Sequence, residues 1–307
     1  MRGVVVPSDG SSTGGGAGDA DLGSYGNRPA VLVAPDASNT GPRYSITQVF
    51  SSGNEAISAA QANGGLLERA QINGTVQLRD NDPNHAGLVF SDCVIDGGAA
   101  SYAVNGFAFG GSPGAPAEFR WCEIRNANSA TALTFDTRLL RCNIHHGVDG
   151  VKTFDNSEVY ACYIHDLKKF AGSHVDGIQV VSGTNIIVHW STIEAWVAED
   201  ATQDPGSVAS GGLQSGSFNG DVYMELYDNW VDGGGYTLRG AGGSEEVTQI
   251  FRRNKHGRGI SPYTGELTNG WFGPISGMNE LDDTSRLVSD YDDSNVWLDD
   301  GMPVNGG

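Results

Sequence analysis

The residues best suited to chemistry crowd into one stretch of the chain, between positions 145 and 179. Four of the seven histidines lie in this stretch. Acids, lysines and an amide accompany them, and the whole cluster comprises His145, His146, Asp149, Lys152, His165, Asp166, Lys168, Lys169, His174, Asp176 and Gln179. Side chains of these types act as general acids and bases, and they also hydrogen-bond polar ligands. The cluster is therefore the first candidate for a catalytic or ligand-binding site.

Two kinds of polysaccharide chemistry match this cluster. A glycosidase needs two carboxyl groups about 5–9 Å apart, and Asp149 and Asp176 are the candidate pair. A lyase needs a base near the sugar carboxylate, for which Lys152, His146 and His174 are candidates. The structural alternative is that Asp-Gly before an apolar residue only turns the chain into a strand. Catalysis, ligand contact without chemistry and a purely structural role all remain open at this point.

A repeat around the four cysteines indicates which elements must position the cluster. Cys and Ile two residues apart recur in segments 91–96, 120–125, 141–145 and 161–165, and related segments without cysteine follow at 190–194 and 228–232. A further copy is expected at 251–254. Successive copies are 29, 20, 20, 29 and 38 residues apart. A base period with variable insertions is typical of a solenoid, and residues 167–175 fill one insertion, where solenoids place binding loops.

The spacing within each copy predicts which side chains face the interior. Residues two apart point to the same face of a strand, so the Cys and Ile positions both face inward. The second position forms an aliphatic ladder of Ile95, Ile124, Ile144, Ile164, Ile193 and Val231. The cysteines continue as Ser191 and Asn229 in a column of small residues near a corner, and we expect free, buried thiols. A zinc site is the alternative, but the short-range ligand pairs of such sites are missing, and no metal site is predicted.

A second column follows on the next strand of each coil. Asp149-Gly-Val-Lys152, Asp176-Gly-Ile-Gln179 and Gly211-Gly-Leu-Gln214 align, with Thr131-Ala-Leu-Thr134 as an earlier copy and Tyr236-Thr-Leu-Arg239 as a later one. Because apolar members alternate inward, the last residue of each copy is expected to face outward. The outward face then carries Thr134, Lys152, Gln179, Gln214 and Arg239. The predicted glycan-binding residues are Lys152, Gln179, Gln214, Arg239 and His146.

Composition limits the partners of the protein. The chain has 307 residues, 45 of them glycine, and a formal net charge of −19. Nucleic acid and anionic membrane surfaces need a basic face, so neither is an expected partner. The sequence has no apolar stretch long enough to span a membrane. Residues 1–6 contain one Arg and three valines before Pro7, a pattern that predicts no signal peptide.

The chain divides into four predicted regions. Residues 1–28 are rich in Gly and Ser and predict a flexible N-terminal arm. Residues 29–62 predict an N-terminal cap that contains a short helix over 54–61, residues 63–278 predict the β-helix, and residues 279–307 form an acidic C-terminal segment. Residues 290–294 begin like a calcium loop but lack the Gly and Glu that an EF-hand requires. No cofactor is predicted, with a looser divalent-cation site as the alternative.

Three segments resemble a known group of proteins. They are Pro35-Asp-Ala-Ser-Asn-Thr-Gly-Pro42, His174-Val-Asp-Gly-Ile-Gln179 and Asn295-Val-Trp-Leu-Asp-Asp-Gly-Met-Pro-Val304. They are similar to the opening, an internal step and the closing segment of right-handed parallel β-helix proteins of actinobacteria and their phages, whose fold is pectate-lyase-like. The resemblance covers about residues 30–304. It implies an all-β, right-handed parallel β-helix, and either a minor tail or tail-fibre protein, commonly a trimer, or a secreted carbohydrate-active relative.

Two functions are therefore expected from the sequence. The first is a structural virion component of a phage tail that contacts host cell-wall polysaccharide, works as a homotrimer with other tail proteins and resides in the virion or outside the cell. The second is a polysaccharide lyase or glycoside hydrolase with a groove around Lys152, Asp176 and Gln179. The Asn-x-Asp, Asp-Asp and Gly-His-Gly set of polygalacturonases does not occur in that order in the sequence, which favours the first function over the enzyme.

Overall fold

The computed structural model describes residues 33–78, 82, 84–98, 100–106, 115–201, 203–215, 222–239, 247–268, 271–276, 287–291 and 294–304. The chain divides into the units Met1–Ala34 and Pro35–Gly307, and the fold below is that of the second unit. The predicted arm, residues 1–28, lies outside the described residues. None of the helical segments in the described part of the chain is long and apolar enough to cross a bilayer.

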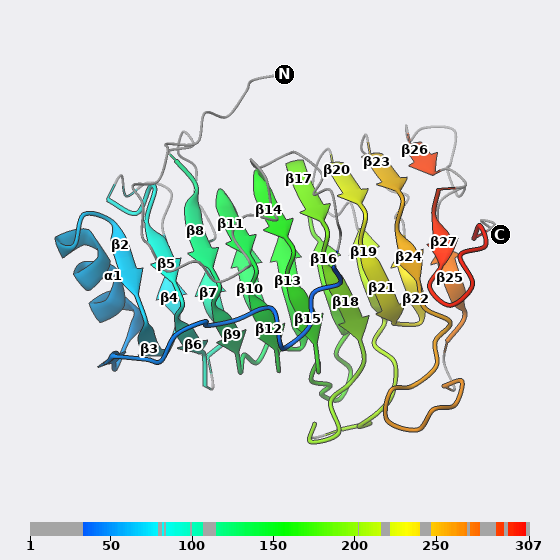
Figure 1. Cartoon of the computed structure of the whole chain (residues 1–307), viewed down its shortest axis with the longest axis horizontal. Coiled ribbons are helices and arrows are strands. Elements are labelled where there is room, and N and C mark those ends of the chain that lie inside the picture. Colours follow the sequence, from blue (N-terminus) through cyan, green and yellow to red (C-terminus); the bar gives the residue numbers. More distant parts are fainter. Residues whose placement is uncertain are drawn as a thin grey trace. The chain divides into compact units, whose positions relative to one another are not determined.

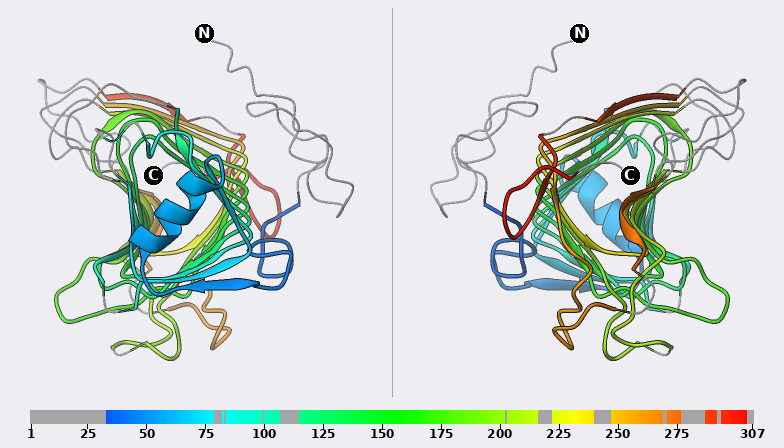
Figure 2. Two further views of the ribbon diagram at one scale, coloured as in Figure 1. Left: turned by 90° about the vertical axis from the view of Figure 1, so that its left-hand side faces the viewer. Right: turned by 90° about the vertical axis from the view of Figure 1, so that its right-hand side faces the viewer.

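The second unit is a right-handed parallel β-helix, which confirms the predicted fold class. Its described strands form three sheets in which every neighbouring pair is parallel (Figure 1). Each complete coil contributes one strand to each sheet, and the end-on views in Figure 2 show the three sheets as the sides of a common interior. Parallel strands joined by such crossovers are right-handed almost without exception.

The three sheets take their strands from successive coils. The ten-stranded sheet contains β1 (Gln48–Phe50), β3 (Ala70–Asn73), β6 (Val94–Asp96), β9 (Glu123–Arg125), β12 (Asn143–His145), β15 (Tyr163–His165), β18 (Thr192–Ala195), β21 (Trp230–Gly233), β24 (Lys255–His256) and β27 (Val296–Trp297). The eight-stranded sheet contains β4 (Val76–Gln77), β7 (Tyr102–Asn105), β10 (Ala130–Thr134), β13 (Asp149–Thr153), β16 (Asp176–Val180), β19 (Gly211–Ser215), β22 (Tyr236–Arg239) and β25 (Gly273–Ser276). The nine-stranded sheet contains β2 (Leu66–Glu68), β5 (Val89–Ser91), β8 (Ala117–Arg120), β11 (Thr137–Leu140), β14 (Ser157–Tyr160), β17 (Gly183–His189), β20 (Val222–Tyr227), β23 (Val247–Arg252) and β26 (Leu287–Tyr291).

A short helix, α1 (Gly53–Ala62), covers the N-terminal end of the coils (Figures 1 and 2). Ser52 caps it by accepting a hydrogen bond from the Glu55 N–H, and the Glu55 carboxylate accepts one from the Ser51 N–H. This exchange satisfies N–H groups that a helix start leaves unpaired. Ala56, Ile57 and Ala60 are buried. The helix thus places an apolar face over the first coils, as the open end of a solenoid requires.

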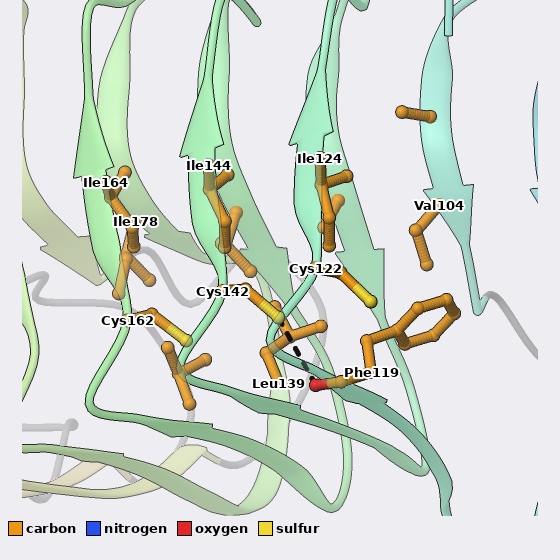
Figure 3. Packing of buried hydrophobic residues seen from close by; sticks show 14 of the residues in the cluster. Val104, Phe119, Cys122, Ile124, Leu139, Cys142, Ile144, Cys162, Ile164 and Ile178 are labelled. Carbon is orange, nitrogen blue, oxygen red and sulfur yellow. Dashed lines mark hydrogen bonds between the residues drawn. The ribbon is translucent and has the colours of Figure 1, made fainter. Parts of the chain in front are cut away.

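The interior is the aliphatic ladder that the repeat predicted. Ile95, Ile124, Ile144, Ile164, Ile193 and Val231 are paired in register along the ten-stranded sheet and are almost completely buried. The four cysteines are free and buried, as expected, and Figure 3 shows Cys122, Cys142 and Cys162 beside the ladder. Each thiol lies within hydrogen-bonding distance of backbone carbonyls, and Cys142 Sγ is 3.2 Å from the Phe119 oxygen. Burial raises the pKa of Cys122 and Cys162, so these thiols are unreactive packing groups.

The cysteine column continues toward the C-terminus as hydrogen-bonded polar residues. Ser191 is followed by Asn229, Asn254 and Asn295, all fully buried. Asn229 Nδ2 donates to Asn254 Oδ1 at 3.0 Å, and Asn254 Nδ2 donates to Asn295 Oδ1 at 3.0 Å. Each Nδ2 also donates to a main-chain carbonyl of a neighbouring coil. The copy expected at 251–254 is therefore present, and the buried amides have partners on both sides.

A left-handed residue precedes each member of this column from Cys93 to Asn254. Its φ lies between 51 and 58° in successive coils, at Asp92, Trp121, Arg141, Ala161, Trp190, Asp228 and Arg253. Bulky residues rarely adopt this conformation. Here the N–H of each donates to the next coil, in six cases to a carbonyl, as Trp121 N does to Leu140 O at 2.8 Å, and at Arg253 to the Ser294 hydroxyl oxygen at 2.9 Å. Stacking of identical corners thus holds a conformation that an isolated turn would not keep.

The stack begins earlier and ends later than the predicted 63–278. Strand β1 lies in the region expected to be only a cap (29–62), and β26 and β27 lie in the region expected to be an acidic tail (279–307). The C-terminal bound was predicted from the last coil that has an aliphatic residue at the ladder position. In the last coils that position holds His256 and Trp297, and burial lowers the pKa of His256 to about 3.

We predict that Ile144→Ala destabilises the unit by about 2–5 kcal/mol, because it removes a fully buried ladder member and leaves a cavity. Denaturant unfolding followed by circular dichroism measures the change. Val49→Ala is the control, since Val49 is 67% exposed. Equal effects of the two substitutions would contradict the ladder as the source of stability.

Candidate functional site

Four of the predicted contact residues lie side by side on the outer face of the eight-stranded sheet. Lys152 pairs with Gln179, Gln179 with Gln214, and Gln214 with Arg239, so one residue from each of β13, β16, β19 and β22 forms a line across the coils. We call these four residues the outer row. Arg239 is exposed and the other three are half-buried. The structure thus brings them together, while their role as ligand contacts remains a prediction.

The predicted fifth member, Thr134, does not belong to this row. Thr134 pairs with Thr153 and is fully buried, and Leu133 takes the place beside Lys152. Ala130, rather than Thr131, is the register partner of Asp149. A shift of one residue moves a side chain to the opposite face of a strand. The prediction for Thr134 was wrong by this single step.

The carboxyl groups of Asp149 and Asp176 lie beneath the outer row. Lys152 Nζ is 3.0 Å from Asp149 Oδ2, and Asp149 Oδ1 accepts a hydrogen bond from the Asp176 N–H at 2.8 Å. A Cβ atom placed on Gly211 would lie 3.1 Å from Asp176 Oδ1 and 3.3 Å from Gln214 Cβ. Gly211 therefore leaves room for the Asp176 carboxyl group next to Gln214. Asp149 and Asp176 are 3% and 0% exposed.

The two carboxyl groups differ in their electrostatic surroundings. Burial, reinforced by the charge of Asp149, raises the pKa of Asp176 to about 8. Neither carboxyl oxygen of Asp176 has a hydrogen-bond partner among the described residues. Burial also raises the pKa of Asp149, and the Lys152 ammonium opposes that rise. Near neutral pH, Asp176 thus holds a proton, and the neighbouring Asp149 carboxyl group is paired with the Lys152 ammonium. One protonated and one ion-paired carboxyl group is the arrangement seen in acid–base pairs.

Glycine at the second position of the three central copies (Gly150, Gly177 and Gly212) lets the coils bend above the ladder. A Cβ atom at Gly150 or Gly177 would lie 2.4 Å from the Cγ2 atom of Ile164 or Ile193, respectively. Each would also collide with a main-chain oxygen of the following coil. Packing therefore requires glycine at positions 150 and 177, and the residue before each glycine is not restricted by this contact. The same bend places the preceding aspartates on the outer side.

The two candidate histidines have different positions. His146 is a left-handed corner residue with φ of 57°, and its Nε2 lies 3.1 Å from Asp200 Oδ1. It lies outside the outer row and contacts an inserted loop instead. His174 is exposed and lies just before β16. It lines a pocket together with Arg239.

This pocket lies where β19 and β22 begin, and three insertions surround it. These insertions leave the coils between the ten-stranded and eight-stranded sheets, and Figure 1 shows them projecting from one side. Their described residues are 166–175, then 196–201 with 203–210, and then 257–268 with 271–272. The pocket has a volume of about 480 Å³. We call it the edge pocket, and it is lined by Lys169, His174, Ser207, Val208, Ala209, Ser210, Gly235, Tyr236, Arg239 and Phe272. Its size lies within the usual range for small-ligand sites.

Hydrogen bonds between the insertions hold the walls of the edge pocket. The Gly235 N–H donates to Ala209 O at 2.7 Å, and the Phe272 N–H donates to Gly235 O at 2.8 Å. The Tyr263 hydroxyl donates to Asp166 Oδ1 at 2.5 Å. These contacts join all three insertions to one another or to the coils. The pocket is therefore largely formed before any ligand arrives, which lowers the entropic cost of binding.

Sequence reasoning missed half of this pocket. Phe272 and the segment 207–210 belong to insertions, which do not follow the repeat, so no periodic pattern identifies them. One signal was present: Trp271 and Phe272 are adjacent aromatic residues flanked by Gly270 and Gly273. Aromatic residues in a glycine-rich loop are a sign of a binding surface rather than of a core.

A metal site is not evident in the described part of the chain. No group of three or more His, Cys, Asp or Glu side chains in the described ranges is arranged to hold an ion. Residues 292–293, inside the segment that begins like a calcium loop, lie outside those ranges.

Comparisons with known proteins add little beyond the fold. No protein-family model matches the sequence, and no curated protein matches it. Among solved structures, pectate lyase Pel9A superposes with a TM-score of 0.43 and 14% sequence identity, over 86% of this chain and 82% of that chain. A likeness at this level says nothing about activity or substrate.

We predict that Asp176 makes the unit less stable as the pH rises. Its pKa of about 8 exceeds the unfolded value of 3.8, so the folded state binds the extra proton between these values and stability falls as the pH rises through them. Asp176→Asn removes this dependence. The free energy of unfolding of the variant, relative to that of the wild type, should increase from about pH 5 to about pH 8, by at most about 1.4 kcal/mol per pH unit. Denaturant unfolding at both pH values tests this, and parallel stability profiles would contradict it.

Proposed function

We propose that this protein binds polysaccharide on a cell surface, through the edge pocket and the adjoining outer row. The observation that carries the proposal is the lining of the edge pocket. It combines the exposed Phe272 ring and the half-buried Tyr236 ring with hydroxyl groups and cationic side chains, at the end of the outer row. Aromatic faces bury the apolar face of a sugar ring while polar side chains bind its substituents. Because the row crosses successive coils, an extended chain can contact several of them at once.

We further propose that the protein is a minor tail or tail-fibre component of a phage and acts in host attachment. The support is the resemblance of segments 35–42, 174–179 and 295–304 to β-helix proteins of actinobacterial phages. A β-helix also suits this role physically, since its coils form a rigid support for the binding surface. Association as a homotrimer and docking to other tail proteins belong to the same proposal.

Retention on insoluble cell-wall polysaccharide from actinobacteria tests the binding function. We expect Arg239→Ala combined with Phe272→Ala to weaken retention at least about tenfold, because a charge-assisted hydrogen bond contributes about 1.5–3 kcal/mol. The matched control combines Arg69→Ala with Tyr44→Ala, which changes an exposed Arg and an exposed aromatic residue near the N-terminal coils. Equal retention of the two double variants would contradict binding at the edge pocket.

A second candidate function is hydrolysis or lyase cleavage of a polysaccharide. The favouring observation is the Asp149–Lys152 ion pair next to the protonated Asp176. Burial of both carboxyl groups weighs against it, because a substrate reaches them only if the side chains above them move. The binding function therefore stands first.

A depolymerisation assay separates the two functions. Wall polysaccharide is incubated with the protein, and new reducing ends and unsaturated-uronate absorbance are measured. If the enzyme function holds, Asp176→Asn and Lys152→Ala lower the rate by about 100-fold or more, the range expected for loss of a general acid or base. Arg69→Ala should leave the rate unchanged. Retention of the protein without any product is the outcome we expect, and it would eliminate the second candidate.

A further inference from the structure

The lining of the edge pocket has a charge opposite to that of the chain. The protein carries 37 acidic and 18 basic residues. The described lining nevertheless contains Lys169, His174 and Arg239, and neither Asp nor Glu. A cationic concavity on an acidic protein selects against cations and raises the local concentration of anions. We propose that the edge pocket binds an anionic saccharide residue, one that bears a carboxylate or a phosphate group. This inference rests on the proposed polysaccharide-binding function and specifies its ligand.

Arg239 and Lys169 differ in how directly a ligand can reach them. Arg239 is exposed, and its planar guanidinium presents paired donors that match both carboxylate and phosphate oxygens. Lys169 Nζ lies 3.3 Å from Asp204 Oδ2, but that carboxylate is 65% exposed. Exposed ion pairs of this kind contribute little, so the lysine can share its charge with a bound anion. Arg239 is accordingly the principal anchor and Lys169 the auxiliary one.

An aromatic platform lies beside these cations. The ring centroids of Tyr236 and Phe272 are 5.8 Å apart at 34°, and Phe272 is 73% exposed. An exposed phenyl group next to a pocket is a contact surface rather than a core element. A ligand with an apolar ring face and a charged substituent would contact the platform and Arg239 together. A free inorganic anion would use only the cations, so the platform favours a charged sugar.

Small residues leave space for the ring between the platform and the cations. The second insertion contributes Ser207, Ala209 and Ser210, and the start of β22 contributes Gly235. Their short side chains permit close approach of a ligand to the main chain, and the serine hydroxyl groups match sugar hydroxyl groups as donors or acceptors. The cavity is thus shaped for a ring, whereas a bare phosphate site would need only converging donors.

Equilibrium binding to three probes tests the inference. They are a glucuronate-containing oligosaccharide, the same oligosaccharide with its carboxyl groups reduced to alcohols, and a poly(glycerol phosphate) chain that carries sugar substituents. We expect at least one anionic probe to bind about tenfold or more tightly than the reduced oligosaccharide, with an affinity that falls as salt is added. A preference for the first or the last probe distinguishes a carboxylate from a phosphate ligand.

Two variants test whether the preference for anionic probes comes from the edge pocket. Arg239→Gln should remove the discrimination between acidic and reduced oligosaccharide, and Phe272→Ala should weaken both anionic and neutral probes. Arg69→Gln, which removes an equivalent exposed charge elsewhere, should behave as the wild type. Equal affinity for the acidic and reduced probes, or discrimination that survives Arg239→Gln, would overturn the inference and leave the proposed function standing. If the wild-type protein is not retained on wall polysaccharide at all, the proposed function itself is wrong.

Discussion

The structure depends on one constraint: each coil must place its backbone in register with the coils on either side. Parallel pairing in three sheets satisfies the strand N–H and C=O groups only when every corner repeats at the same place. The left-handed residues before the small-residue column show how strict this is. A tryptophan at position 121 and an arginine at 141 adopt φ values of 54 and 53° because their N–H groups bond to the next coil. Side-chain identity is secondary to the path of the main chain.

The same constraint determines where function can arise. Residues on the coils are confined by stacking, so the outer row acquires its order from strand pairing alone. Insertions between the ten-stranded and eight-stranded sheets are free of that restriction, and they supply most of the edge pocket. The stacked coils thus provide stability, and the inserted loops at one edge provide the binding surface. Substitutions at exposed positions of the insertions can therefore change the ligand without disturbing the ladder, whereas Leu167 and Val175 pack in the same core.

Much of the fold could be predicted from pairs of small and aliphatic residues that lie two positions apart in each repeat. The Cys and Ile positions identify the interior face, and the predicted ladder and column are present from Ile95 to Val231 and from Cys93 to Asn229. The outer row followed from the same reasoning, except at Thr134, where a one-residue choice between Ala130 and Thr131 decides the face. The pocket was beyond this approach, because the placement of Phe272 and Ser207 depends on contacts between insertions distant in sequence. Burial of Asp176 was equally inaccessible, since it depends on packing above the row.

The asparagine column gives the unit two ends with different physical character. Near the N-terminus, α1 covers the coils with buried Ala56, Ile57 and Ala60. Near the C-terminus, Asn229, Asn254 and Asn295 join the coils through side-chain amides. Apolar association weakens on cooling, whereas amide hydrogen bonds do not share that temperature dependence. The two ends are therefore held by interactions with different temperature dependences: cooling weakens the apolar cover of α1 more than it weakens the amide column.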